Sequence, residues 1–256
     1  MIFDVKGKAF AVLKGNWFKV VFMMFLCFFI GVITGTGRST LTFNNGDFNF
    51  RLLTFSASDS IFVVILGGFI GSICFFAIVD LIHNIKFNIR KRFLLTFLYS
   101  FKTKSLLIKG FLINSLNRLL QFGIVILTAI VIVNFLTLFI GELTGIRIIK
   151  LLGLILTIII IIWVYLGLSQ CMYLLYEEPK ISILNCIKNS CKMMKGNRLS
   201  LISLYAIFSF WILLGLIAFV IGVLWSFAYF EVTKFEFYQM LKRKEKQKEW
   251  HGAFES

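Results

Sequence analysis

The sequence predicts an all-α membrane protein, a bundle of about six transmembrane helices. The chain has 256 residues, of which 59% are hydrophobic and only 15% are charged. A soluble domain with one core cannot bury that much apolar surface, whereas a bilayer covers it. Uncharged runs of helix-crossing length, and an uneven distribution of Lys and Arg between them, predict the same fold class.

Four uncharged runs mark the first four spans. They are residues 20–37, 60–79, 119–141 and 151–176. Each is close to the ~17–25 residues that a helix needs to cross a hydrocarbon core. A fifth run extends from Leu199 to Phe230. As one helix it would measure roughly 48 Å, against a core of about 30 Å. It is therefore either one strongly tilted helix or a hairpin that turns between Gly215 and Gly222.

The distribution of Lys and Arg favours the hairpin. With six spans and an internal N-terminus, the inner segments hold 23 Lys and Arg residues and the outer segments hold 4. With five spans the inner segments hold 17 Lys and Arg residues and the outer segments hold 10. Because cytoplasmic segments of membrane proteins collect positive charge, six spans is the better prediction. It places both termini, including the basic tail 242–256, in the cytoplasm.

An amphipathic segment precedes each pair of spans, at residues 1–17, 90–109 and 180–198. Helices of this kind lie in the membrane interface with their lysines toward the headgroups. The chain is therefore predicted to be a single integral membrane domain with three repeat-like units. These units are residues 1–83, 84–175 and 176–241, followed by the tail.

A short sequence echo supports the repeat. Lys14-Gly15-Asn16-Trp17 precedes the first span, Lys195-Gly196-Asn197 precedes the fifth, and Lys109-Gly110 precedes the third. Gly and Asn tolerate left-handed backbone geometry, so they suit a break between a surface helix and a descending one.

The net charge of +15 fits cytoplasmic loops that meet anionic lipid. The expected partners are the lipid bilayer, anionic lipid headgroups on the cytoplasmic face, and a membrane protein or a second copy of the chain. Nucleic acid is not expected, because the sequence has no basic soluble domain with interleaved aromatic residues. The five cysteines show no disulfide or zinc spacing, so neither a metal nor another cofactor is predicted.

The most recognisable residues lie near the two ends of the chain. They are Gly15, Asn16 and Trp17, then Lys195, Gly196 and Asn197, then Trp211 and Tyr229. In this pattern the chain resembles the domain of unknown function 975 family of Gram-positive bacteria. A Pro commonly precedes the Tyr in that family, whereas this chain has Ala228. The resemblance implies a multi-pass protein of the bacterial cell membrane with no established activity.

Acidic residues and a histidine lie at the predicted inner ends of two spans. Asp80 and His83 are three residues apart and share a helix face, and Glu177 and Glu178 end the fourth span at the same depth. These four residues form the only candidate acid or metal cluster. The alternative is that they meet the headgroups and pair with neighbouring lysines. No catalytic motif is present, so no catalytic residue is predicted.

Other residues suggest contacts within the membrane. Asn134 lies in the third span, and Ser169 and Gln170 in the fourth are its expected partners, either for hydrogen bonds between helices or for a solute. Small residues that let helices approach closely include Gly67 with Gly71, Gly31 with Gly35, and Ala218 with Gly222.

Three function classes follow. The first is a non-catalytic accessory or scaffold protein, linked to peptide export, bacteriocin immunity or envelope stress. The second is a channel or transporter for a small or amphipathic solute, which rests on Asn134 and the repeat. The third is a membrane-embedded lipid-modifying enzyme, which rests on the acidic cluster.

Overall fold

The computed structural model describes residues 2–33, 40–44, 47–51, 57–140, 145–217 and 219–254. The predicted all-α bundle is confirmed, with a short antiparallel hairpin added, in which Thr40 pairs with Arg51. The elements are α1 (Ile2–Leu13), α2 (Trp17–Ile33), β1 (Thr40–Asn44), β2 (Asp47–Arg51), α3 (Ala57–Lys86), α4 (Phe93–Phe97), the 3₁₀ helix η1 (Leu98–Lys102), α5 (Lys104–Ile140), α6 (Gly145–Leu168), α7 (Cys171–Glu177), α8 (Ile183–Met194), α9 (Arg198–Ile217) and α10 (Phe219–Phe254).

Four stretches of helix are long and apolar enough to cross a membrane. They are Ile65–Lys86, Lys104–Phe135, Ile149–Glu177 and Arg198–Leu216. The pair α1 and α2, bent by 94°, brings the number to five if it counts as one span. The first five predicted spans fall in α2, α3, α5, α6 and α9, whereas the sixth falls in the first half of α10, which is not among the candidate spans found in the described residues.

The overlong apolar run folds as two helices that pack against each other. Helix α9 ends at Ile217 and α10 begins at Phe219. A Cβ added to Gly215 would lie 2.8 Å from the carbonyl of Gly222, so the two backbones touch where the sequence predicts close packing. Ala218, the other residue predicted for this contact, lies outside the described residues.

The predicted glycine contact on α3 faces α5. The amide of Asn114 donates a hydrogen bond of 2.8 Å to the carbonyl of Gly68. A Cβ on Gly71 would meet the side chain of Asn114 at 2.7 Å, and Gly67 is buried. These small residues therefore join two helices of one bundle. Gly35, from the remaining predicted pair, lies outside the described residues.

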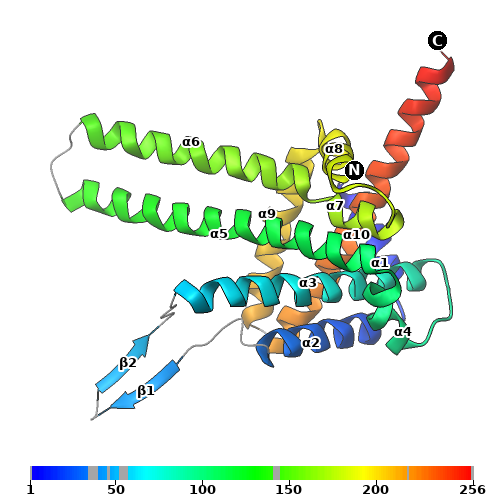
Figure 1. Cartoon of the computed structure of the whole chain (residues 1–256), viewed down its shortest axis with the longest axis horizontal. Coiled ribbons are helices and arrows are strands. Elements are labelled where there is room, and N and C mark those ends of the chain that lie inside the picture. The colour runs from blue at the N-terminus through cyan, green and yellow to red at the C-terminus, as the bar shows by residue number, and fades with distance from the viewer. Residues whose placement is uncertain are drawn as a thin grey trace.

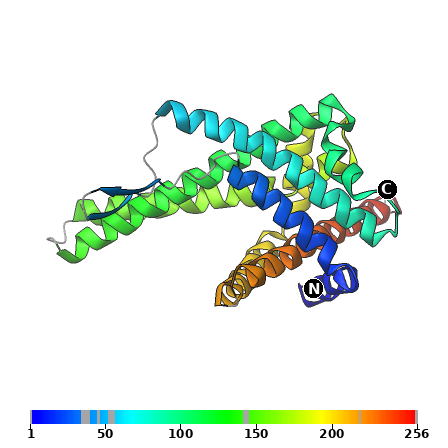
Figure 2. The same ribbon diagram turned by 90° about the horizontal axis from the view of Figure 1, so that it is seen from below.

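The core lies where α3, α7 and α10 meet. Tyr173 stacks on Tyr238 with ring centroids 5.2 Å apart and meets the edge of Phe75 at 5.0 Å. Helices α5 and α6 instead project side by side away from this core (Figure 1). The apolar window of the α5 span has 0% of its residues buried, as expected of a helix that lipid covers. Helix α1 and the last turns of α10 lie at the end of the molecule opposite to the tips of α5 and α6 (Figure 2).

The two Lys-Gly-Asn segments form the same turn. Gly15 has φ of 80° and Gly196 has φ of 81°, in the left-handed region. The amide of Asn16 donates to the carbonyl of Leu13 at 2.8 Å, and the amide of Asn197 donates to Met194 at 3.0 Å. Each turn redirects the chain from an amphipathic helix into an apolar one, which agrees with the sequence echo.

The middle copy of the echo, Lys109-Gly110, which has no Asn, forms no turn. Gly110 lies inside the continuous helix α5, and a Cβ there would collide with the ring of Phe76. Lys109 instead donates to the carbonyls of Pro179, Lys180 and Ile181, at 3.1, 3.3 and 2.7 Å. This glycine is needed for close packing and not for a turn.

The left-handed turns can be tested with alanine variants. Gly15→Ala and Gly196→Ala should each lower the free energy of unfolding by about 1–2 kcal/mol, because a Cβ is strained at positive φ although no atom lies within 4 Å of it. Thermal unfolding of the detergent-solubilised chain measures the loss. Gly153→Ala, in the exposed face of α6, is the matched control and should not be destabilised. Equal midpoints for all three variants would contradict the prediction.

Candidate functional site

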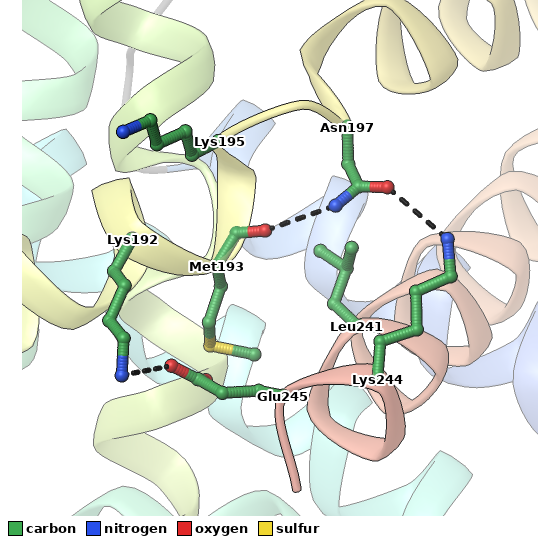
Figure 3. Close-up of a pocket in the computed structure, with 7 residues that line it drawn as sticks. All are labelled: Lys192, Met193, Lys195, Asn197, Leu241, Lys244 and Glu245. Carbon is green, nitrogen blue, oxygen red and sulfur yellow. Dashed lines mark hydrogen bonds and ion pairs between the residues drawn. The ribbon is translucent and has the colours of Figure 1, made fainter. Parts of the chain in front are cut away.

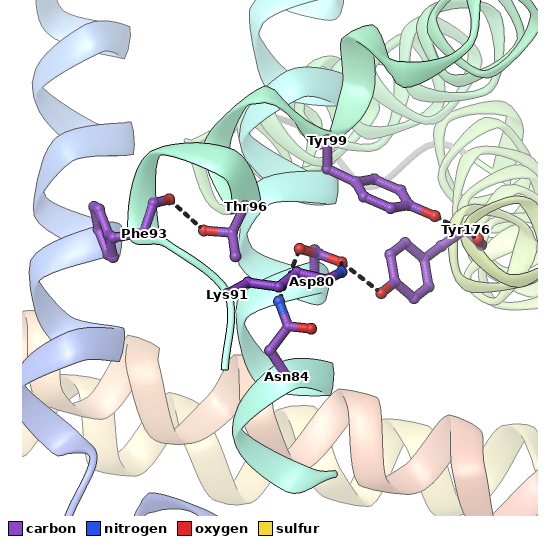
Figure 4. A network of polar contacts seen from close by, with 7 residues as sticks. All are labelled: Asp80, Asn84, Lys91, Phe93, Thr96, Tyr99 and Tyr176. Atoms are coloured by element: carbon purple, nitrogen blue, oxygen red, sulfur yellow. Dashed lines mark hydrogen bonds and ion pairs between the residues drawn. The ribbon is translucent and has the colours of Figure 1, made fainter. Parts of the chain in front are cut away.

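Asp80 is the centre of a buried polar network at the end of α3 (Figure 4). Its side chain accepts hydrogen bonds from the phenol of Tyr176 at 2.9 Å, the amide of Asn84 at 2.9 Å and the ammonium of Lys91 at 3.2 Å. A fully buried carboxylate is costly unless it is paired and hydrogen-bonded. Three donors from three elements meet that need, so Asp80 holds α3, α7 and the segment before α4 together.

Glu177 makes a second network with α10. Its carboxylate accepts from the phenol of Tyr238 at 2.6 Å and the amide of Gln239 at 3.2 Å, and it pairs closely with Lys242. Burial and the bond to Glu177 raise the pKa of Tyr238 well above its ordinary value. The phenol therefore stays protonated and remains a donor to Glu177.

A third ion pair connects α3 directly to α10. The ammonium of Lys86 lies 2.6 Å from the carboxylate of Glu236, which is almost fully buried. The same ammonium lies 5.6 Å from the ring centroid of Phe235. Together with the networks of Asp80 and Glu177, this pair holds α3, α7 and α10 together.

Of the four residues of the predicted acid or metal cluster, His83 and Glu177 line one cavity of about 220 Å³. Asp80 and Glu177 accept from different lysines, and Glu178 is exposed. The ring of His83 packs on Phe87 at 4.5 Å. No group of three or more His, Cys, Asp or Glu residues within the described ranges is placed to hold a metal ion. The sequence analysis expected neighbouring lysines and missed the partners Tyr176, Tyr238 and Lys242, because nothing in the local sequence connects Asp80 with Tyr176 or Glu177 with α10.

Asn134 lies apart from Ser169 and Gln170. It is exposed on α5, and its amide donates to the carbonyl of Ile130 at 2.8 Å. The register of the α5–α6 pair follows from Gln121, which donates to Tyr165 at 2.9 Å. Asn134 lies about 20 Å further along α5, at about 1.5 Å per residue, whereas Ser169 lies just beyond Tyr165 in the opposite direction.

Ser169 and Gln170 instead line a polar cavity of about 150 Å³ between α5, α6, α7, α9 and α10. The amide of Gln170 donates to the hydroxyl of Ser169 at 3.0 Å. The side-chain oxygens of Gln170 and Tyr173, residues that are 2% and 3% exposed, have no hydrogen-bond partner in the described structure. Lys234, paired with Glu231 at 2.5 Å, contributes a cation to the wall. The cavity can accept a small polar molecule.

The second Lys-Gly-Asn turn opens into a basic pocket of about 290 Å³ (Figure 3). Lys244 donates to the side chain of Asn197 at 3.4 Å, and Lys192 pairs with Glu245 at 3.1 Å. Lys195 also lines the pocket, whose lining therefore holds three lysines and one carboxylate. Met193 and Leu241 supply apolar walls. A pocket with an excess of cations and an apolar wall suits an anionic amphiphile.

Two of the recognisable aromatic residues, Trp17 and Tyr229, meet at the first turn. Trp17 stacks on Trp225 with centroids 5.2 Å apart, and Tyr229 donates to the carbonyl of Lys6 at 3.2 Å. Trp211 is half exposed on α9, and its carbonyl accepts from Ser226 of α10 at 3.2 Å. Trp17 and Tyr229 therefore join α1 and α2 to α10, and Trp211 lies in the α9–α10 hairpin.

A comparison with protein families confirms the family resemblance that these residues indicated. The family described as "Protein of unknown function (DUF975)" matches residues 2–245. No curated protein and no solved structure matches the chain. The turns of Gly15 and Gly196 and the contacts of Trp17 and Tyr229 all lie within the matched range, and the chain belongs to the DUF975 family.

Proposed function

We propose that the chain is a non-catalytic, multi-pass protein of the bacterial cell membrane that acts as an accessory or scaffold. The observation that carries the proposal is the use of the acidic groups. Asp80, Glu177 and Glu236 each pair with a lysine from another element and hold helix ends in place. A lipid-modifying enzyme is not proposed, because two of the acids on which it would depend, Asp80 and Glu177, are engaged in this way.

The proposed topology has both termini in the cytoplasm. Support comes from the contact between α1 and α10, which brings the N-terminal helix beside the helix that follows the last turn. Two ends on one side require an even number of crossings. The excess of Lys and Arg in the inner segments gives that side its orientation.

Reporter fusions test this topology. A reporter that is active only in the cytoplasm should be active after Ser256 and inactive when inserted at residues 141–144, because the proposal places these positions on opposite sides. Reporter activity in intact cells, normalised to protein amount, gives the reading. An external signal after Ser256 would reject the six-span topology.

The scaffold is proposed to act on the inner leaflet through its amphipathic helices. Helix α1 buries Val5, Ala9 and Leu13, while Lys8 and Lys14 are exposed. Helix α8 likewise buries one face and exposes lysines on another. Such a surface attracts anionic headgroups by about 1 kcal/mol for each basic residue near the membrane. Peptide export, immunity to membrane-active peptides and envelope stress are cellular settings in which this attraction would matter.

Lipid selectivity of the reconstituted chain tests the proposal. In vesicles of phosphatidylcholine with a minor fraction of spin-labelled lipid, labelled phosphatidylglycerol should be restricted by the protein several-fold more strongly than labelled phosphatidylcholine. Electron spin resonance measures the restricted fraction of each. The preference should shrink in about 1 M salt, where the Debye length is about 3 Å. Equal restriction of the two lipids at low salt would contradict an anionic-lipid scaffold.

A transporter for a small polar solute is the second candidate. The observation that favours it is the polar cavity of Ser169 and Gln170, which lies between helices of different repeat-like units. The unpartnered oxygens of Gln170 and Tyr173 supply hydrogen-bonding groups for a solute.

Alternating access to the cavity tests transport. Ser169→Cys, in a chain whose five native cysteines are replaced by Ala, should react with a charged, membrane-impermeant thiol reagent from each side of the membrane in turn. Thr128→Cys is the matched control, because Thr128 is exposed on a lipid-facing stretch of α5 and should stay unlabelled. Labelling of Ser169→Cys from one side only, or from neither, would exclude a transport pathway through this cavity.

A further inference from the structure

A second basic pocket lies at the first Lys-Gly-Asn turn. Its volume is about 400 Å³. Asn16 and Lys19 line it from the start of α2, Asn84 from the end of α3, and Arg90 and Lys91 from the segment that follows α3. Lys91 shares its charge with Asp80, so Lys19 and Arg90 give the pocket its excess of positive charge.

The backbone on both sides of the pocket is held in place. The left-handed turn at Gly15 presents Asn16, whose side chain accepts from the ammonium of Lys19 at 3.0 Å. On the other side, Asn88 has φ of 53°, and the amide of Ile89 donates to the carbonyl of Asn84 at 2.9 Å. The cationic side chains thus extend from two fixed turns that face each other.

Asn84 adds a buried acceptor to the pocket. Its amide group donates to Asp80, but its side-chain oxygen has no hydrogen-bond partner in the described structure, and the residue is 5% exposed. A buried amide oxygen without a partner costs free energy of the order of 1–3 kcal/mol. A ligand that suits this pocket therefore offers a hydroxyl donor as well as a negative charge.

An exposed aromatic surface continues from the rim of the pocket. Phe93, which lines the pocket, lies 5.7 Å from Phe22, and Phe22 stacks on Phe18 at 6.0 Å. Phe18 is 81% exposed and Phe22 is 42% exposed. These rings extend along the start of α2, an apolar helix, so they would meet acyl chains. A free phosphate has no apolar group that could contact this surface.

From these observations we infer that the pocket of Asn16, Lys19, Asn84 and Arg90 binds one anionic glycerophospholipid whose headgroup carries hydroxyl groups. The phosphodiester lies between Lys19 and Arg90, a headgroup hydroxyl donates to the side-chain oxygen of Asn84, and an acyl chain follows Phe93 and Phe22. The inference deepens the proposed anionic-lipid scaffold, on which it rests, by assigning it a defined lipid site.

Lipid binding to single-residue variants tests the site. The full chain is released from mixed micelles with phosphatidylglycerol, and native mass spectrometry counts the lipids that remain bound. Arg90→Gln should weaken binding of phosphatidylglycerol about fivefold, as expected for one basic residue at a membrane surface. Arg92→Gln is the matched control, since Arg92 is an exposed neighbour that does not line the pocket. Its effect should stay below about twofold.

Two further probes distinguish the parts of the proposed ligand. Phosphatidylmethanol has the same charge as phosphatidylglycerol but no headgroup hydroxyl, and it should bind several-fold more weakly. Inorganic phosphate at millimolar concentration should not displace phosphatidylglycerol. Displacement by phosphate would show an anion site without a lipid preference, and equal binding of the two lipids would remove the role of Asn84. Either result overturns the inference.

The outcomes also separate this site from the general scaffold. Equal losses in Arg90→Gln and Arg92→Gln would mean that charge acts diffusely, which overturns the site. The scaffold proposal would survive that result if the spin-labelled lipids still show a preference for phosphatidylglycerol. Loss of that preference in the unmodified chain would instead remove the scaffold proposal.

Discussion

Pairing of buried carboxylates with lysines is the interaction on which the rest of the structure depends. Asp80 and Glu236 are almost fully buried, and a carboxylate in such a place costs several kcal/mol unless cations and donors surround it. Lys91 and Lys86 supply the cations, and Tyr176 adds a donor. Because these partners come from different elements, the C-terminal ends of α3 and α7 are joined to the middle of α10.

Away from these ion pairs, some helices make few contacts with the rest of the protein. Helices α5 and α6 contact each other and project from the core with apolar side chains exposed around them (Figure 1). In water such a hairpin would be a liability, whereas lipid covers it without further packing. The amphipathic helices end in turns at Gly15 and Gly196, so the lysines gather where headgroups would lie. Both basic pockets open at these turns.

Much of the helical architecture could be predicted from the sequence, because runs without charge and the spacing of Lys and Arg are local properties. The break of the overlong run and the equivalence of the Gly15 and Gly196 turns were predicted from such signals. The sequence did not show what Gly110 does, because a glycine needed for contact with Phe76 resembles a glycine needed for a turn. Asn134 was expected to contact Ser169 and Gln170 because their side chains are of compatible types. The sequence did not give the register of α5 against α6, which places Asn134 far from them.

The sequence by itself determined that this is a helical membrane protein of the DUF975 family, because hydropathy, charge and a few Gly-Asn and aromatic positions do not depend on distant contacts. The tertiary structure alone decided which lysine meets Asp80 or Glu177, and that Asn84 and Arg90 share a pocket with Asn16. Those relations join positions far apart in the chain. Helix packing determines these contacts, and no local sequence pattern predicts how the helices pack.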